Sequence, residues 1–159
     1  MANTEQDVYS LLIPAAGDSI LLPNIGVAEV VAYFGNVDKP KAGAPKWLMG
    51  YLQWRGKHVP TISMEVMVGN DAPTLTRLSR LAILNTPSAH SEVPHVAVIV
   101  TGIPRLTRVT EDMLQPIEGL TPTSKARAFM SGQTIQIPDV EKFEQMALET
   151  MAFKPDQMS

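Results

Sequence analysis

The side chains in this sequence that are best suited to chemistry are three histidines, His58, His90 and His95. None of them lies in the His-Glu-x-x-His spacing of a zinc site, and none is near a Gly-x-Ser-x-Gly elbow or a Gly-rich phosphate loop. Ser63 and His58 could supply a nucleophile and a base, but nothing in the sequence nominates the carboxylate that would orient the histidine. We therefore interpret His58 as a solvated turn histidine and expect no catalytic residue and no enzymatic activity. A hydrolase remains the weakest alternative, and it would need a pocket around His58 or His95.

The carboxylates do not form a paired acid–base set either. Glu111 and Asp112 stand at the start of a predicted turn, and Glu141, Glu144 and Glu149 fall within a predicted C-terminal helix, where we expect them to be solvated. The sequence contains no cysteine, which excludes disulfides and thiolate metal ligands. We expect neither a metal nor a cofactor.

Composition narrows the class of protein further. The chain has 159 residues, with 16 acidic against 13 basic side chains and a net charge of −3, and no block of like charges. This balance does not indicate a nucleic-acid partner or an anionic membrane surface. No apolar run approaches the ~20 residues of a membrane span, and the N-terminus lacks the features of a signal peptide. We expect a cytoplasmic protein with no direct membrane insertion.

The elements that would position any site are predicted to be short strands. Thirteen prolines and ten glycines in a chain that is 18% charged favour short elements joined by turns. The central one is a β-hairpin within residues 45–66, in which Leu52 and Trp54 share one face. Residues 55–58 form its turn, with Gly56 at positive φ.

The sequence also makes predictions for a short helix, two tryptophans and a methionine-rich segment in or next to this central stretch. Pro45 and Gly50 predict a short helix before the hairpin, since proline suits a first helical turn and glycine an end. Trp54 is expected in the barrel interior, whereas Trp47 could lie in the core or at the edge of a groove. The methionine-rich residues 64–67 could be an adaptable contact surface or, more commonly, core filling.

About nine strands and one terminal helix make up the predicted fold. Further strands are expected at residues 8–13, 19–22, 27–33, 80–85, 96–100, 103–109, 127–130 and 133–137, the last two joined at Ser131-Gly132. Asp139 is a suitable N-cap for a helix over 139–152. The interpretation is a mainly β single domain over residues 8–153, with a first small antiparallel barrel at about 8–70, a second at about 71–138, and flexible tails at 1–7 and 154–159.

The central stretch resembles the pattern of CheW-like domains. The resemblance rests on a proline at Pro45, a glycine five residues later at Gly50, the Arg-Gly pair Arg55-Gly56 five residues beyond, and Pro60 after a short spacer. Residues 27–30, 97–109, 113–116 and 139–143 extend it across most of the chain. It departs from the family at Ser63 and Thr101, where acidic residues are usual. This divergence is similar to that of the ChpC-type auxiliary adaptors of type IV pilus chemosensory systems.

The resemblance implies a fold and a role. The fold would be two small SH3-like antiparallel β-barrels that share a core, with a C-terminal helix. The role would be a non-enzymatic scaffold that couples the cytoplasmic tip of chemoreceptors to the regulatory domain of a CheA-type histidine kinase. The alternative is a CheW-like regulatory domain that competes with a main adaptor, or binds a small ligand, without bridging.

The resemblance also assigns partner-binding residues. Its receptor-facing groove corresponds to Val27, Glu29, Val30, Arg55 and Gly56. Since Glu29 and Arg55 carry opposite charges, we expect them to pair across the first barrel. Without the resemblance, Arg55 would be interpreted as a solvated turn arginine.

Overall fold

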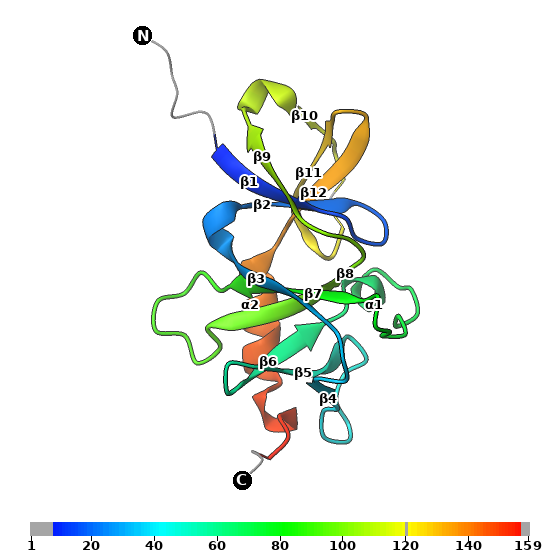
Figure 1. Ribbon diagram of the computed structural model, residues 1–159, viewed down its shortest axis with the longest axis vertical. Helices are drawn as coiled ribbons and strands as arrows, with labels where there is room; N and C mark the ends of the chain where they lie inside the picture. Colours follow the sequence, from blue (N-terminus) through cyan, green and yellow to red (C-terminus); the bar gives the residue numbers. More distant parts are fainter. Residues whose placement is uncertain (1–7, 120, 157–159) are drawn as a thin grey trace.

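Two six-stranded sheets lie one above the other in the computed structural model, which describes residues 8–119 and 121–156 (Figure 1). Sheet A consists, in spatial order, of β10 (Gln115–Pro116), β11 (Ser124–Met130), β12 (Gln133–Pro138), β2 (Ser19–Pro23), β1 (Val8–Ile13) and β9 (Arg105–Val109). Sheet B consists of β3 (Val27–Ala32), β7 (Arg80–Asn85), β8 (His95–Val100), β6 (Lys57–Ile62), β5 (Leu48–Trp54) and β4 (Val37–Asp38). Two helices, α1 (Met64–Met67) and α2 (Val140–Glu149), and the 3₁₀ turns Asn24–Gly26, Glu111–Met113 and Met151–Phe153 complete the chain.

Both predicted hairpins are present and have two-residue turns. In each turn both residues have positive φ, 51° and 74° at Arg55-Gly56 and 49° and 80° at Ser131-Gly132. Two successive positive φ angles are the requirement of a type I′ turn, whose twist matches that of the flanking strands. The four-residue turn expected at 55–58 is therefore wrong, because Lys57 already pairs with Trp54 across the hairpin.

The expected shared core is confirmed. One cluster of buried apolar side chains combines Ile13 and Ile20 from sheet A with Ile62 and Val98 from sheet B, and α2 inserts Phe143 into it. Two smaller clusters lie within sheet B and within sheet A. α2 runs behind sheet B and begins near the junction of the two sheets (Figure 1), and its Phe143 and Ala147 pack into the cluster that both sheets share.

The strands do not divide between the two sheets at residues 70 and 71, where the boundary between the barrels was expected. β1 and β2 pair with β9 and β12 in sheet A, and β7 and β8 pair with β3 and β6 in sheet B. The β1–β2 hairpin is apolar on both faces. Its Ile13 and Ile20 enter the shared cluster, while its Leu12 and Leu21 enter the cluster of sheet A. Such a hairpin must be covered on both faces, and within sheet A one face lies on the shared cluster and the other on the cluster of sheet A.

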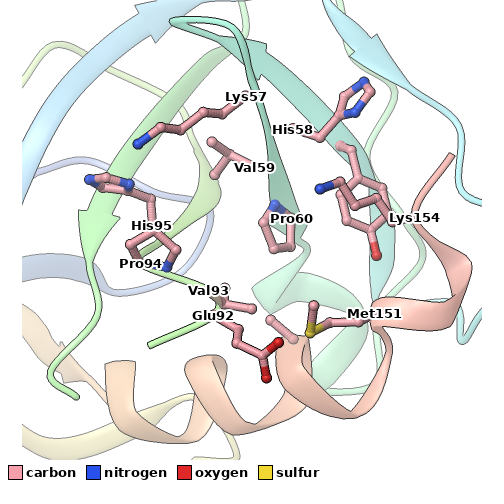
Figure 2. A pocket seen from close by; sticks show the side chains of 12 residues that line it. Lys57, His58, Val59, Pro60, Glu92, Val93, Pro94, His95, Met151 and Lys154 are labelled. Carbon is pink, nitrogen blue, oxygen red and sulfur yellow. The ribbon is translucent and has the colours of Figure 1, made fainter. Parts of the chain in front are cut away.

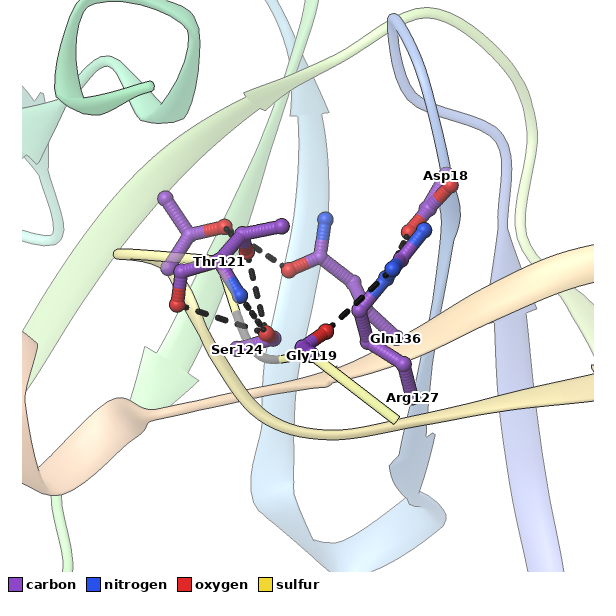
Figure 3. Close-up of polar contacts among 7 residues, drawn as sticks. Asp18, Gly119, Thr121, Ser124, Arg127 and Gln136 are labelled. Atoms are coloured by element: carbon purple, nitrogen blue, oxygen red, sulfur yellow. Dashed lines mark hydrogen bonds and ion pairs between the residues drawn. The ribbon is translucent and has the colours of Figure 1, made fainter. Parts of the chain in front are cut away.

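A polar cluster fixes the tip of the β1–β2 hairpin to β11 (Figure 3). Arg127 Nε donates to Asp18 Oδ2 at 2.9 Å, and Arg127 Nη1 donates to the Gly119 carbonyl at 3.3 Å. The side chains of this ion pair are only 23% and 19% exposed, so the arginine and the carboxylate are partly desolvated together. The contact holds the N-terminal hairpin to strands more than a hundred residues away.

Other local expectations are corrected by the structure. The predicted helix at 45–50 is a single turn in which the Leu48 N–H donates to the Pro45 carbonyl, followed at once by β5. The methionine-rich residues 64–67 form α1, and Met64 and Met67 pack on the shared cluster, so they are core rather than a contact surface. Trp47 also packs against this cluster while staying partly exposed.

The ends of the chain are described in part. Of the tails expected to be flexible at 1–7 and 154–159, residues 1–7 and 157–159 lie outside the described residues. Asp156 lies 3.3 Å from the Lys41 ammonium, and both groups are exposed. Among the described residues, no helix is long and apolar enough to cross a membrane.

Candidate partner-binding site

The site is built where β3 meets the tip of the β5–β6 hairpin. Glu29 Oε1 accepts a hydrogen bond from Trp54 Nε1 at 3.0 Å and another from Arg55 Nη2 at 3.3 Å. The expected pairing of Glu29 and Arg55 is therefore present. The Arg55 side chain is 68% exposed and that of Glu29 43%, so both charges reach the surface. An ion pair of this exposure contributes about 0–1 kcal/mol to stability.

Trp54 lies beneath Glu29 and Arg55 and contacts both of them. It is 9% exposed, as the alternation along β5 predicted, and its ring belongs to the apolar cluster of sheet B. A buried indole N–H requires a hydrogen-bond acceptor, and Glu29 supplies it. The Arg55 guanidinium lies 4.7 Å from the centroid of the Trp54 ring, within range of a cation–π contact. Arg55 is thus positioned by both Trp54 and Glu29.

A β-bulge at Ala28 decides which β3 side chains join this site. Val27 pairs with Leu84 and Glu29 with Ile83, so β3 has one extra residue against β7. The extra residue places Val27 and Val30 on the same face, packed against the shared cluster. Glu29 points to the other face, toward Trp54. Of the predicted residues, the structure brings Glu29, Arg55 and Gly56 together and leaves Val27 and Val30, both partly exposed, on the opposite face of β3.

Gly56 contributes backbone geometry to the site. Its φ of 74° lies in the left-handed region, and no atom lies within 4 Å of where a Cβ would stand. A side chain there would therefore strain the turn rather than clash with a neighbour. The turn conformation is what directs Arg55 back over Trp54.

His58 is not the solvated turn histidine that the sequence suggested. Its side chain is 9% exposed, and its Nε2 lies 2.9 Å from Asp38 Oδ2. Gln53 Nε2 donates to both oxygens of the same carboxylate at 2.9 Å. The hydrogen bonds from Gln53 and then from His58 lower the pKa of Asp38. β4 pairs with β5 at Tyr51 and Leu52, which is what brings Asp38 to this position.

Glu144 also differs from the expectation of a solvated carboxylate. It is 3% exposed, and its Oε1 accepts from the Ser88 N–H at 3.3 Å, because the loop between β7 and β8 lies over this part of α2. Glu111, Asp112, Glu141 and Glu149 are exposed as predicted.

The remaining candidates for chemistry have structural surroundings. The Ser63 hydroxyl is fully buried and accepts from the Val66 N–H as the N-cap of α1, so it is engaged away from His58. His90 is exposed in a loop. His95 stacks edge-on against Trp54 with centroids 4.9 Å apart. Burial, followed by the charges of Lys57 and Arg55, lowers the pKa of His95. Within the described part of the chain, no three acidic or histidine side chains are grouped so as to hold a metal ion.

Sequence reasoning missed the hydrogen bond of Trp54, although the need of a buried indole for an acceptor was a usable signal. It also missed the contact between Trp54 and His95 and the partnership of Asp38 with His58. No sequence signal marked these two, since each depends on strand order.

Comparisons with known proteins agree with this architecture. The model of the CheW-like domain matches residues 10–147. Among solved structures, the chain is similar to the crystal structure of scaffolding protein TtCheW from Thermoanaerobacter tengcongensis, at 20% sequence identity and a TM-score of 0.64 over 83% of this chain and 88% of that chain. No curated protein matches the sequence. A family match over most of the chain, on a fold of two sheets sharing a core, shows that this chain belongs to the CheW-like domain family.

Proposed function

We propose that this protein is a non-enzymatic adaptor of a chemotaxis-type signalling system in the cytoplasm, which couples chemoreceptors to a CheA-type histidine kinase. The observation that carries the proposal is the surface formed by Glu29 and Arg55. Two opposite charges are positioned by the buried Trp54, and both side chains remain 43% or more exposed. Rigid, exposed charges of this kind determine which partner binds more than they determine stability.

The family match and the similar fold of a scaffolding protein support this role. On this proposal, the receptor tip contacts Glu29, Arg55 and Gly56 directly, and the partly exposed Val27 and Val30 add apolar contact from the other face of β3.

Bridging requires a second surface, and we propose that it lies at the end of β3 and start of β7. Phe34 and Leu78 are 76% and 87% exposed, and the Tyr33 N–H bonded to the Ser79 carbonyl places the two segments side by side. Large exposed apolar side chains in adjacent positions favour a protein partner. Phe34 lies beyond the end of β3, five residues after Glu29, so the two proposed surfaces share no residue.

Charge reversal tests the first surface. Glu29→Arg and Arg55→Glu should each weaken receptor binding about five- to tenfold, because each places a like charge against a complementary partner. The double variant keeps an ion pair, so its free energy of unfolding should stay within about 0.5 kcal/mol of the wild type. Lys125→Glu, which reverses an exposed charge on β11 by the same amount as Arg55→Glu, is the matched control. Unchanged binding in all Glu29 and Arg55 variants would sink the proposed surface.

We also propose that the protein acts as a ChpC-type auxiliary adaptor in a type IV pilus chemosensory system. Its support is the sequence divergence at Ser63 and Thr101. Deletion of the gene should impair twitching and leave swimming unchanged. Impaired swimming with normal twitching would refute this setting while leaving the adaptor role intact.

A further inference from the structure

A pocket lies between one end of sheet B and the C-terminal segment, away from the apolar end of β3 (Figure 2). Its empty volume is ≈ 420 Å³, including the part open to solvent. Val59, Pro60, Val93, Ala147 and Met151 give it an apolar floor. An apolar floor with a few polar groups at its margin is the lining that sites for small organic molecules have.

The polar groups at its margin are mainly basic. Lys57 and His95 lie on one side, with the Lys57 amino group beside the histidine ring, and Lys154 lies on the opposite side (Figure 2). Within the described residues, neither lysine ammonium has a carboxylate or hydrogen-bond partner. His58 also borders the pocket, but its Nε2 is engaged by Asp38. Glu92, which is exposed, is the acidic side chain of the lining.

His95 has one ring nitrogen without a partner among the described residues. Its Nδ1 is buried and has no hydrogen-bond partner in the described structure. An unsatisfied buried polar atom is costly, and such atoms in native proteins call for a missing partner. A ligand in the pocket would satisfy this nitrogen if the ring turned it toward the pocket, next to the Lys57 ammonium.

We propose that this pocket binds a small organic anion, a carboxylate carried on an apolar body. The apolar part would lie on Pro60, Val93 and Met151, and the carboxylate would lie toward the basic side chains at the margin. Binding of this kind is separate from the adaptor role, so its failure leaves that role untouched.

Benzoate is a suitable probe, with benzamide as its neutral counterpart of the same shape. The full chain has three histidines, so their ring signals can be followed individually by NMR. We expect benzoate to shift the His95 signals saturably with a Kd below about 1 mM, whereas benzamide should bind at least about tenfold more weakly. Bound benzoate should also raise the pKa of His95, because an adjacent anion favours the protonated ring. The exposed His90 is the internal control and should not respond.

Charge variants of the lining give effects of opposite sign. Lys57→Met and Lys154→Met should each weaken benzoate binding about three- to fivefold, whereas Glu92→Gln should tighten it, because a like charge is removed. Lys125→Met, on β11 of sheet A, should leave the Kd unchanged. Equal binding of benzoate and benzamide, equal shifts at His90 and His95, or Glu92→Gln failing to tighten binding would each overturn the proposal. The comparison of the two probes uses the unaltered protein, so it does not depend on whether a variant folds.

Discussion

Replacing Trp54 by phenylalanine removes the N–H that holds Glu29 while keeping an aromatic ring in the core of sheet B. The Nε1–Oε1 distance is 3.0 Å, and the acceptor side chain is 43% exposed. A hydrogen bond to a charged group contributes about 1.5–3 kcal/mol when protected, and solvent competition at Glu29 reduces this to about 1 kcal/mol. The smaller phenylalanine ring should lower the free energy of unfolding by about 1–2 kcal/mol more, as partial truncations of core side chains do.

A double-mutant cycle separates these two costs. Trp54→Phe and Glu29→Ala, singly and combined, should show a coupling of about 1 kcal/mol in urea unfolding followed by far-UV circular dichroism. The same cycle with Arg55→Ala and Glu29→Ala should give at most about 0.5 kcal/mol, because that pair is more exposed. Trp47→Phe is the matched control, since Trp47 packs on the other apolar cluster and should be additive with Glu29→Ala.

A Trp54–Glu29 coupling below about 0.3 kcal/mol, the usual error of additivity, would mean that the indole does not hold the carboxylate. A larger coupling of Glu29 to Arg55 than to Trp54 would mean that the surface ion pair, and not the indole, positions the carboxylate.

Three further predictions concern local structure. Gly50→Ala should destabilise the protein by about 2–4 kcal/mol, because a Cβ there would lie 2.2 Å from the carbonyl oxygen of Asp38 at a φ of 152°. Gly26→Ala is the control: it has open space and should change the stability by less than about 0.5 kcal/mol. Equal effects of the two substitutions in thermal unfolding would contradict this prediction. Ser63→Ala removes the cap of α1 and should cost about 0.5–2 kcal/mol in urea unfolding, and an unchanged midpoint would show that the cap is unimportant. A hydrogen bond from Gln53 is the largest cause that lowers the pKa of Asp38 below 3.8, so the stability this carboxylate provides is complete above that pH and is lost as the pH falls through its folded pKa. The stability difference between wild type and Asp38→Asn should therefore be constant near neutral pH and shrink below pH 3.8, and a difference that grows on acidification would refute the assignment.

Local patterns were sufficient for the central hairpin and its ion pair. Alternation of apolar residues placed Trp54 inside, and Arg55-Gly56 marked the turn, because these signals act between neighbours in the chain. The partner of Arg55 followed from the family resemblance rather than from the alternation. The bulge at Ala28, which divides the predicted site between two faces of β3, has no sequence signature of its own.

Long-range associations were beyond local patterns. Proximity in sequence predicts that the N-terminal hairpin joins the strands that follow it, but its two apolar faces pack on the cluster of sheet A and on the shared cluster. The sequence predicts solvated side chains at His58 and Glu144, because histidine and glutamate are usually exposed. Their burial depends on β4 and on the loop after β7, which reach them only in the folded chain.

The most direct test of the adaptor role is co-sedimentation of receptor arrays with the kinase. With the wild-type protein present, we expect the kinase to sediment with the receptors, and with Arg55→Glu the recovered kinase should fall while the protein remains folded. Kinase recovery that is equal with and without this protein, or binding of only one partner at a time, would contradict the claim that it bridges them.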